Sequence, residues 1–119
     1  MHIGKTVFFV MVLVMAGLFP AGAEEKYGIK MYEGAKYDAA VSKSVSESMS
    51  INISCYRTND PVVKVVEFFK TQAGLDYVGG DKENALFKKG SVDVTIQTPW
   101  MDLKTGKMMK DTLISIVKQ

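Results

Sequence analysis

The first 23 residues constrain the fold most, because they have the three-part layout of a secretory signal and not the pattern of a folded domain. Lys5 supplies a positive charge, and residues 7–18 are apolar apart from glycine. That run is shorter than the ~20 residues of a membrane span. The small residues Ala21 and Ala23 then stand where a signal peptidase would cleave. We therefore expect a signal peptide over residues 1–23, with an uncleaved N-terminal anchor as the alternative.

Cleavage would leave residues 24–119, a chain long enough for one small domain with a single core. Subtracting Lys5 from the fifteen basic residues leaves fourteen against thirteen acidic ones, a net charge near +1. This balance gives no electrostatic reason to expect nucleic acid or an anionic membrane as a partner. We expect an exported protein, periplasmic or secreted, with no stable membrane insertion after cleavage.

Histidine and cysteine are too rare for several common kinds of site. The only histidine, His2, lies in the predicted signal, so the processed protein would have no imidazole for a triad, a zinc site or acid-base catalysis. Cys55 is the only cysteine, which excludes an intramolecular disulfide. Its place in an alternating apolar pattern favours burial over an intermolecular bond.

Alternation of apolar and polar residues predicts the first strand. Met49, Ile51, Ile53 and Cys55 would share one face, with serines and an asparagine on the other. The preceding residues 24–40 contain three tyrosines and two glycines, and we expect them to form an extended N-terminal arm with a turn.

A helix is predicted to begin at Pro61, with Asp60 as its N-cap. Proline fixes its own φ and lacks an amide proton, so it suits the first helical position. The apolar residues that follow recur at helical spacing, and Gly74 is suited to end the helix. Those expected to share the buried face are Val62, Val65, Val66, Phe69 and Ala73.

The remaining chain is predicted to form three or four further strands. Residues 75–78 begin one, and residues 85–97 read as a hairpin. Residues 112–118 form a last strand that is apolar on both faces, so we expect it to be central or to be covered by the helix on one side and the N-terminal arm on the other. The fold expected is a two-layer α+β domain: an antiparallel sheet of about four strands with one main helix on one face, in the order β-α-β-β-β.

Several short segments resemble a group of small exported bacterial proteins of unassigned function. They are "MYEGAKYD", "YRTND", the paired aromatics "FF" and the C-terminal "VTIQTPWMDLKTGKMMKDTLISI". In that group the first segment commonly reads Tyr-Pro-Gly-Ala and the helix ends in Phe-Tyr, whereas here Glu33 and Phe69 stand at those places. The resemblance implies an exported α+β domain and carries no catalytic residues to transfer.

No catalytic, cofactor or metal-binding constellation is predicted. The carboxylates are spread singly, no histidine would activate a serine, and no glycine-rich phosphate loop is present. One cluster remains, since closing the last hairpin would bring together one tryptophan and three methionines, residue types enriched at binding surfaces. We predict a partner-contact surface formed by Trp100, Met101, Met108 and Met109. The alternatives are gap-filling core residues and a copper(I) site of the three thioethers.

The function expected is that of a non-catalytic binding or accessory module, with another exported protein as the candidate partner. A periplasmic metal-handling protein that binds copper(I) through Met101, Met108 and Met109 is the first alternative, and an enzyme of unknown type is the second.

Overall fold

The computed structural model describes residues 24–119, so the predicted signal peptide, residues 1–23, lies outside the described residues. The described chain forms ten strands and two helices. In chain order they are β1 (Glu25–Lys26), β2 (Ile29–Lys30), β3 (Lys36–Tyr37), α2 (Ala39–Met49), β4 (Asn52–Thr58), α3 (Val62–Lys70), β5 (Asp76–Gly80), β6 (Asn84–Lys89), β7 (Val92–Gln97), β8 (Trp100–Met101), β9 (Met108–Met109) and β10 (Thr112–Lys118).

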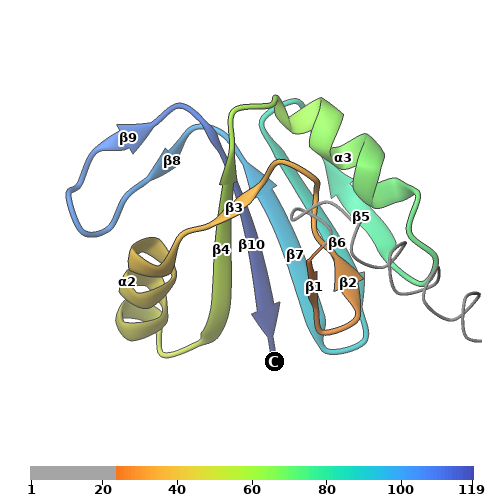
Figure 1. Ribbon diagram of the computed structural model, residues 1–119, viewed down its shortest axis with the longest axis horizontal. Helices are drawn as coiled ribbons and strands as arrows, with labels where there is room; N and C mark the ends of the chain where they lie inside the picture. The colour runs from red at the N-terminus through yellow and green to blue at the C-terminus, as the bar shows by residue number, and fades with distance from the viewer. Residues whose placement is uncertain (1–23) are drawn as a thin grey trace, which may run out of the picture.

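A six-stranded antiparallel sheet is the body of the protein, in the order β3-β4-β10-β7-β6-β5 (Figure 1). Two small hairpins, β1–β2 and β8–β9, stand beside it. The last strand, β10, pairs with β4 on one side and β7 on the other. This confirms the prediction that the strand with apolar residues on both faces is central.

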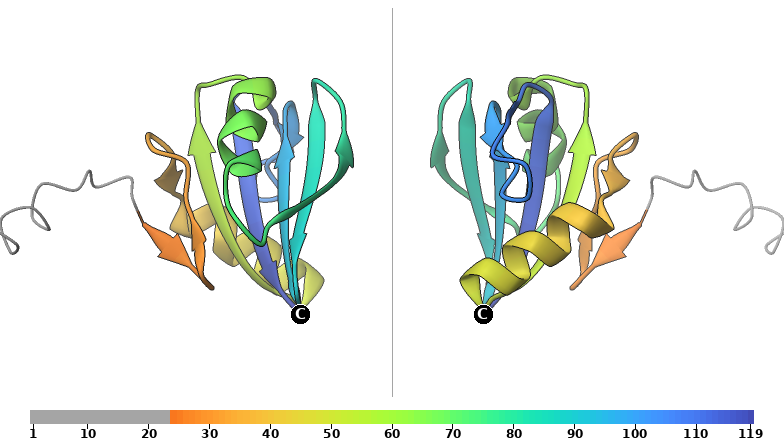
Figure 2. Two further views of the ribbon diagram at one scale, coloured as in Figure 1. Left: turned by 90° about the vertical axis from the view of Figure 1, so that its right-hand side faces the viewer. Right: turned by 90° about the vertical axis from the view of Figure 1, so that its left-hand side faces the viewer.

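The two helices cover opposite faces of the sheet, as the two side views in Figure 2 show. Beneath α3 lies the larger core cluster, which takes Ile114 and Ile116 from β10. Beneath α2 lies a smaller one, formed by Val41, Cys55, Trp100 and Leu113. Because successive side chains of a strand point to opposite faces, β10 contributes residues to both clusters.

The predicted α+β class, a two-layer four-stranded sheet with one main helix, is wrong. The described residues are 43% strand and 21% helix, with six strands in the main sheet and a helix on each face, so the fold is β-rich. Five of the strands have only two residues, too short to leave an alternating pattern in the sequence. The layer that the prediction lacks is α2, whose last residue, Met49, the alternating pattern assigns to a strand.

Helix α2 forms because its apolar residues follow the helical repeat. Val41, Val45 and Met49 stand four residues apart, and this places them on one side of the helix. Asp38 is the N-cap, with Oδ1 accepting the Val41 N–H at 2.9 Å. Ser50 ends the helix in the left-handed conformation, so the strand predicted from Met49 begins only at Asn52.

Helix α3 confirms the predicted helix, with a correction at its start. Four of the five predicted residues are buried, namely Val62, Val65, Val66 and Phe69, whereas Ala73 lies past the helix end and is exposed. The N-cap is Pro61, without a side-chain hydrogen bond. Asp60 does not cap the helix because its carboxylate accepts the hydroxyl of Tyr32 and its carbonyl accepts Thr112 Oγ1 at 2.5 Å.

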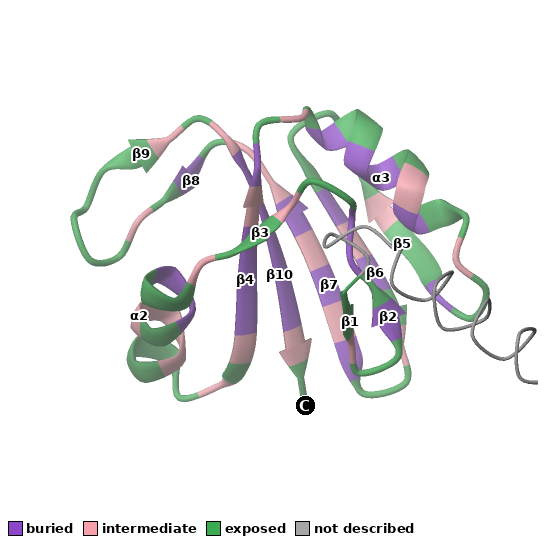
Figure 3. Cartoon of the chain, in the orientation of Figure 1, coloured by how far each residue is buried: buried purple, intermediate pink, exposed green. Residues whose placement is uncertain are grey.

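The N-terminal residues are more regular than the predicted extended arm. The β1–β2 hairpin turns at Tyr27 and Gly28, both at positive φ, and β3 then joins the edge of the main sheet beside β4. Ile29 and Tyr32 are buried in the larger cluster, so this segment forms part of the core. Figure 3 shows where buried and exposed residues alternate along the strands.

Candidate functional site

The candidate site is a groove of about 370 Å³ on the face of the sheet that carries α2. Its floor comes from β4, β10 and β7, one wall from α2, and the other wall from the β8–β9 hairpin and its loop. The residues that line it are Val45, Met49, Ile51, Ile53, Thr95, Gln97, Trp100, Met101, Leu103, Leu113, Ser115 and Val117.

The floor changes from apolar to polar across the strands because of their register. Leu113 on β10 stands opposite Gln97 on β7, and Ser115 stands opposite Thr95. On the other side of β10, Val117 pairs with Ile53. A ligand lying across this floor would therefore meet aliphatic side chains near α2 and hydrogen-bonding side chains on β7.

The walls end in exposed apolar side chains. Met49 at the end of α2 is 60% exposed, and Met101 and Leu103 on the hairpin are 53% and 46% exposed. Most large apolar residues are buried because their exposure to water is unfavourable. Apolar side chains exposed together around a groove are typical of a binding surface.

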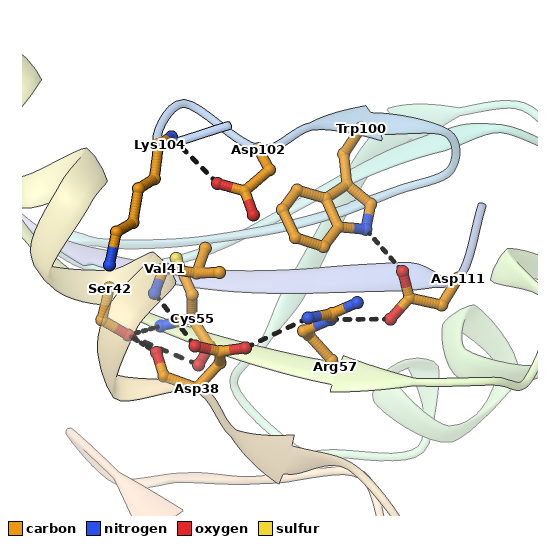
Figure 4. A network of polar contacts seen from close by, with 9 residues as sticks. All are labelled: Asp38, Val41, Ser42, Cys55, Arg57, Trp100, Asp102, Lys104 and Asp111. Carbon is orange, nitrogen blue, oxygen red and sulfur yellow. Dashed lines mark hydrogen bonds and ion pairs between the residues drawn. The ribbon is translucent and has the colours of Figure 1, made fainter. Parts of the chain in front are cut away.

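A polar network fixes both walls to the sheet (Figure 4). Arg57 on β4 donates from Nη1 to Asp38 Oδ2 at 3.2 Å and from Nε to Asp111 Oδ2 at 2.8 Å. Asp111 Oδ1 also accepts the indole N–H of Trp100 at 3.0 Å. The Arg57 network, formed by Asp38, Arg57, Trp100 and Asp111, thus joins the start of α2 to the base of the hairpin.

Hydrogen bonds within the Arg57 network favour the charged forms of Asp38 and Arg57. The N–H of Val41 and the guanidinium of Arg57 lower the pKa of Asp38, against the opposing effect of burial. The hydrogen bonds that Arg57 donates to Asp111 and Asp38 raise its own pKa. Two carboxylates therefore share one guanidinium.

A buried serine of α2 binds a backbone amide of β4 at a position where β3 no longer pairs with that strand. The N–H of Cys55 donates to Ser42 Oγ at 2.8 Å, and that hydroxyl donates to the carbonyl of Asp38 at 2.7 Å. This lets α2 lie against β4 without leaving a buried amide unsatisfied. Cys55 itself is buried, as predicted, and burial raises the pKa of its thiol.

The four residues predicted to form a contact surface come together in the β8–β9 hairpin. Trp100 pairs with Met109, and Met101 pairs with Met108. Trp100 is only 2% exposed and Met109 packs on the smaller core cluster, while Met101 and Met108 are more than half exposed. Trp100 therefore supports the surface from below, and the exposed part consists of the two other methionines together with Leu103.

The hairpin register separates the three thioethers proposed as copper(I) ligands. Neighbouring residues of a strand point to opposite faces, so Met108 and Met109 diverge. Met101 shares a face with Met108, and Met109 shares the other with Trp100. The hairpin therefore does not converge three sulfurs on one point, and the copper reading has no support from this geometry.

A second hollow, of about 430 Å³, lies beside the β1–β2 hairpin and the end of α3. Gln72 crosses it by bonding both backbone groups of Lys30, at 3.0 and 2.7 Å. Phe68 is the only large apolar side chain that lines it. Ligand sites are mostly apolar with a few polar groups, a description that the α2 groove fits better despite its smaller volume.

The sequence alone missed most of the groove. Val45, Ile53, Leu103 and Leu113 were not predicted as site residues, and neither was Arg57. The four-residue spacing of Val41, Val45 and Met49 was the available signal for the α2 wall. The pairing of Arg57 with Asp38 and Asp111 joins positions 19 and 54 residues apart, and no local pattern reports it.

Among residues 24–119, no cluster of histidine, cysteine, aspartate and glutamate is placed to hold a metal ion. In the same range, neither helix has the length and apolarity needed to cross a membrane. Comparison of the chain with protein-family models, curated proteins and solved structures gave no significant match.

Proposed function

We propose that this protein is a non-catalytic binding module and that the α2 groove receives the aliphatic chain of a lipid-like molecule. The observation that carries this proposal is the groove itself, which is lined mainly by Val, Ile, Leu and Met side chains, with Thr95, Gln97 and Ser115 as the polar part of its floor. Methionine side chains adapt to irregular flexible ligands, and Met49 and Met101 stand on opposite walls.

The size of the groove favours a small ligand over a folded partner. Its volume lies within the ~300–1,000 Å³ of small-molecule sites. It is lined by twelve residues, whereas a stable protein–protein interface uses about 20–30 residues on each side. An aliphatic chain has the width and flexibility to lie between α2 and the hairpin.

We propose binding without catalysis because the acidic and thiol groups near the groove are already bound or buried. Asp38 and Asp111 are both bound by Arg57, and the Cys55 thiol is buried with a raised pKa. None of these groups is available as an activated nucleophile or a general base.

A neutral dye separates this proposal from its rivals. N-phenyl-1-naphthylamine should bind the purified protein saturably and be displaced by 1-decanol. Replacing two exposed wall residues, in the variant Met101→Gln/Leu103→Gln, should weaken 1-decanol binding about 10-fold, since both side chains lose apolar contact with the chain. Val63→Gln, an exposed residue of α3 on the opposite face, is the matched control.

Saturable binding that the wall variant weakens and the control does not would support the site. Dye binding that is unsaturable, or equal in all three proteins, would reject the groove as a ligand site. Circular dichroism of the variants checks that the fold is retained.

We also propose export, based on the leader pattern in residues 1–23. Mass spectrometry of the protein recovered from the periplasm or medium should find Glu24 at the N-terminus. A chain that retains Met1 would contradict cleavage.

A further inference from the structure

We infer that the ligand of the α2 groove is an anionic amphiphile, a free fatty-acid-like molecule whose acid group is bound by lysines of the β8–β9 hairpin. This inference rests on the proposed function, and it adds the charge of the ligand and the place of its head group. The three hairpin lysines are Lys104, Lys107 and Lys110.

The hairpin carries an excess of positive charge next to the groove. Residues 100–110 contain three lysines and one carboxylate, Asp102, a difference of +2. All three lysines are exposed. Across residues 24–119, the ion pairs that form leave the hairpin lysines without a carboxylate within 4.0 Å.

The fold of the loop places one of these lysines next to a residue that lines the groove. The backbone N–H of Lys104 donates to Asp102 Oδ1 at 2.9 Å, and Asp102 exchanges backbone hydrogen bonds with Lys107 and Gly106. Lys104 directly follows Leu103, which lines the groove. Figure 4 shows the Lys104 side chain running from the hairpin in the direction of α2.

A lysine at this place can act on both parts of an amphiphile. Its methylene chain can lie along apolar surface while its ammonium group stays in water. An acid group at the mouth of the groove would accept a charge-assisted hydrogen bond from that ammonium. The aliphatic chain would then extend inward between Met49 and Met101.

The other charges near the groove do not offset the hairpin lysines. Helix α2 presents Lys43 and Glu47, one charge of each sign. Asp38 and Asp111 share Arg57, which leaves a charge of −1 on this network, but none of these three residues lines the groove. The charges of α2 and of the hairpin therefore sum to +2, and this excess comes from the hairpin.

Thr95 and Gln97 offer a different head-group site, because neutral hydrogen-bonding groups would suit an alcohol as well as an acid. Decanoate and 1-decanol share a ten-carbon chain and differ at the head group, so they separate the two possibilities. Titration calorimetry at low salt should give decanoate about 5-fold tighter binding than 1-decanol. The difference should shrink in 0.5 M salt, because salt screens exposed charges.

The double variant Lys104→Met/Lys107→Met should remove the preference for decanoate and leave 1-decanol binding unchanged. Lys64→Met is the matched control, because Lys64 is an exposed lysine on α3 at the opposite face. Equal binding of the two ligands by the wild type would overturn the inference, and so would a preference for decanoate that survives in the double variant.

Three further outcomes reject the inference for distinct reasons. If neither ligand binds, the proposed function fails together with it. If the protein sediments with phosphatidylglycerol vesicles but binds no decanoate, the hairpin recognises a membrane surface and not a free acid. If the protein binds 1-decanol but not decanoate, the proposed function stands and only the inference that the ligand has a charged head group is rejected.

Discussion

Arg57 lies over the indole of Trp100, with 5.0 Å between its central guanidinium carbon and the ring centroid. Asp111 bonds to both of these side chains, and Asp38 bonds to Arg57 from the start of α2. Arg57, on β4, is therefore linked to both walls of the groove, through Asp38 to α2 and through Asp111 and Trp100 to the hairpin.

Removing the guanidinium should destabilise the protein. Arg57→Met leaves Asp38 and Asp111 partly buried without a counter-charge, and the expected loss is about 1–3 kcal/mol in the free energy of unfolding. Urea denaturation followed by circular dichroism measures it. Lys88→Met, which breaks the more exposed pair with Asp93, should cost at most about 1 kcal/mol. Equal losses in the two variants would contradict the role given to Arg57.

The cap of α2 can be separated from the charge of Asp38. Asp38→Asn keeps an oxygen for the Val41 N–H, whereas Asp38→Ala removes it, so alanine should cost about 0.5–2 kcal/mol more in unfolding free energy. Urea denaturation of both variants at neutral pH is the measurement. If both substitutions cost the same, the cap contributes nothing and the ion pair with Arg57 accounts for the whole effect.

Asp38 should also make stability depend on acid pH. Folding lowers the pKa of this carboxyl, so its stabilisation is present above the ordinary aspartate pKa of about 4 and is lost as pH falls through the lower folded value. The unfolding free energy of the wild type should fall between about pH 5 and pH 3. Asp38→Asn should fall less over the same range, and parallel curves would contradict the assignment.

Two neighbouring glycines should differ sharply in their tolerance of alanine. A Cβ at Gly80 would lie 2.2 Å from the carbonyl oxygen of Asn84, a backbone atom of the paired strand. Gly80→Ala should therefore cost about 1–3 kcal/mol through overpacking. At Gly79 nothing lies within 4 Å of the added atom, so Gly79→Ala should stay within about 0.5 kcal/mol of the wild type. Thermal unfolding of both variants compares them directly.

The thiol of Cys55 should be unreactive in the folded protein. It is 0% exposed and its pKa is raised by burial, so its modification requires local opening of the structure. Reaction with Ellman's reagent should be at least ~100-fold slower than in denaturant. Ser48→Cys in a Cys55→Ala background provides an exposed thiol on α2 as a control. A native rate close to that of the control would place Cys55 at an accessible position.

Some elements were predictable because their signal is local. Helix α3 is marked by a proline and by valines at helical spacing, and the β6–β7 hairpin by alternation on both sides of Gly90. Helix α2 was not predicted because Met49 continues an alternating run into β4, and four alternating residues fit a strand as well as a helix end.

The chain by itself determined a central C-terminal strand and one amphipathic helix, because burial of apolar residues at regular spacing requires no knowledge of distant contacts. Only the tertiary structure decided that the sheet has six strands, that a second helix covers the other face, and that a groove lies beside it. Those features depend on pairings between distant residues, such as Arg57 with Asp38 and Asp111, and the energy of such pairings exists only once the sheet has brought the partners together.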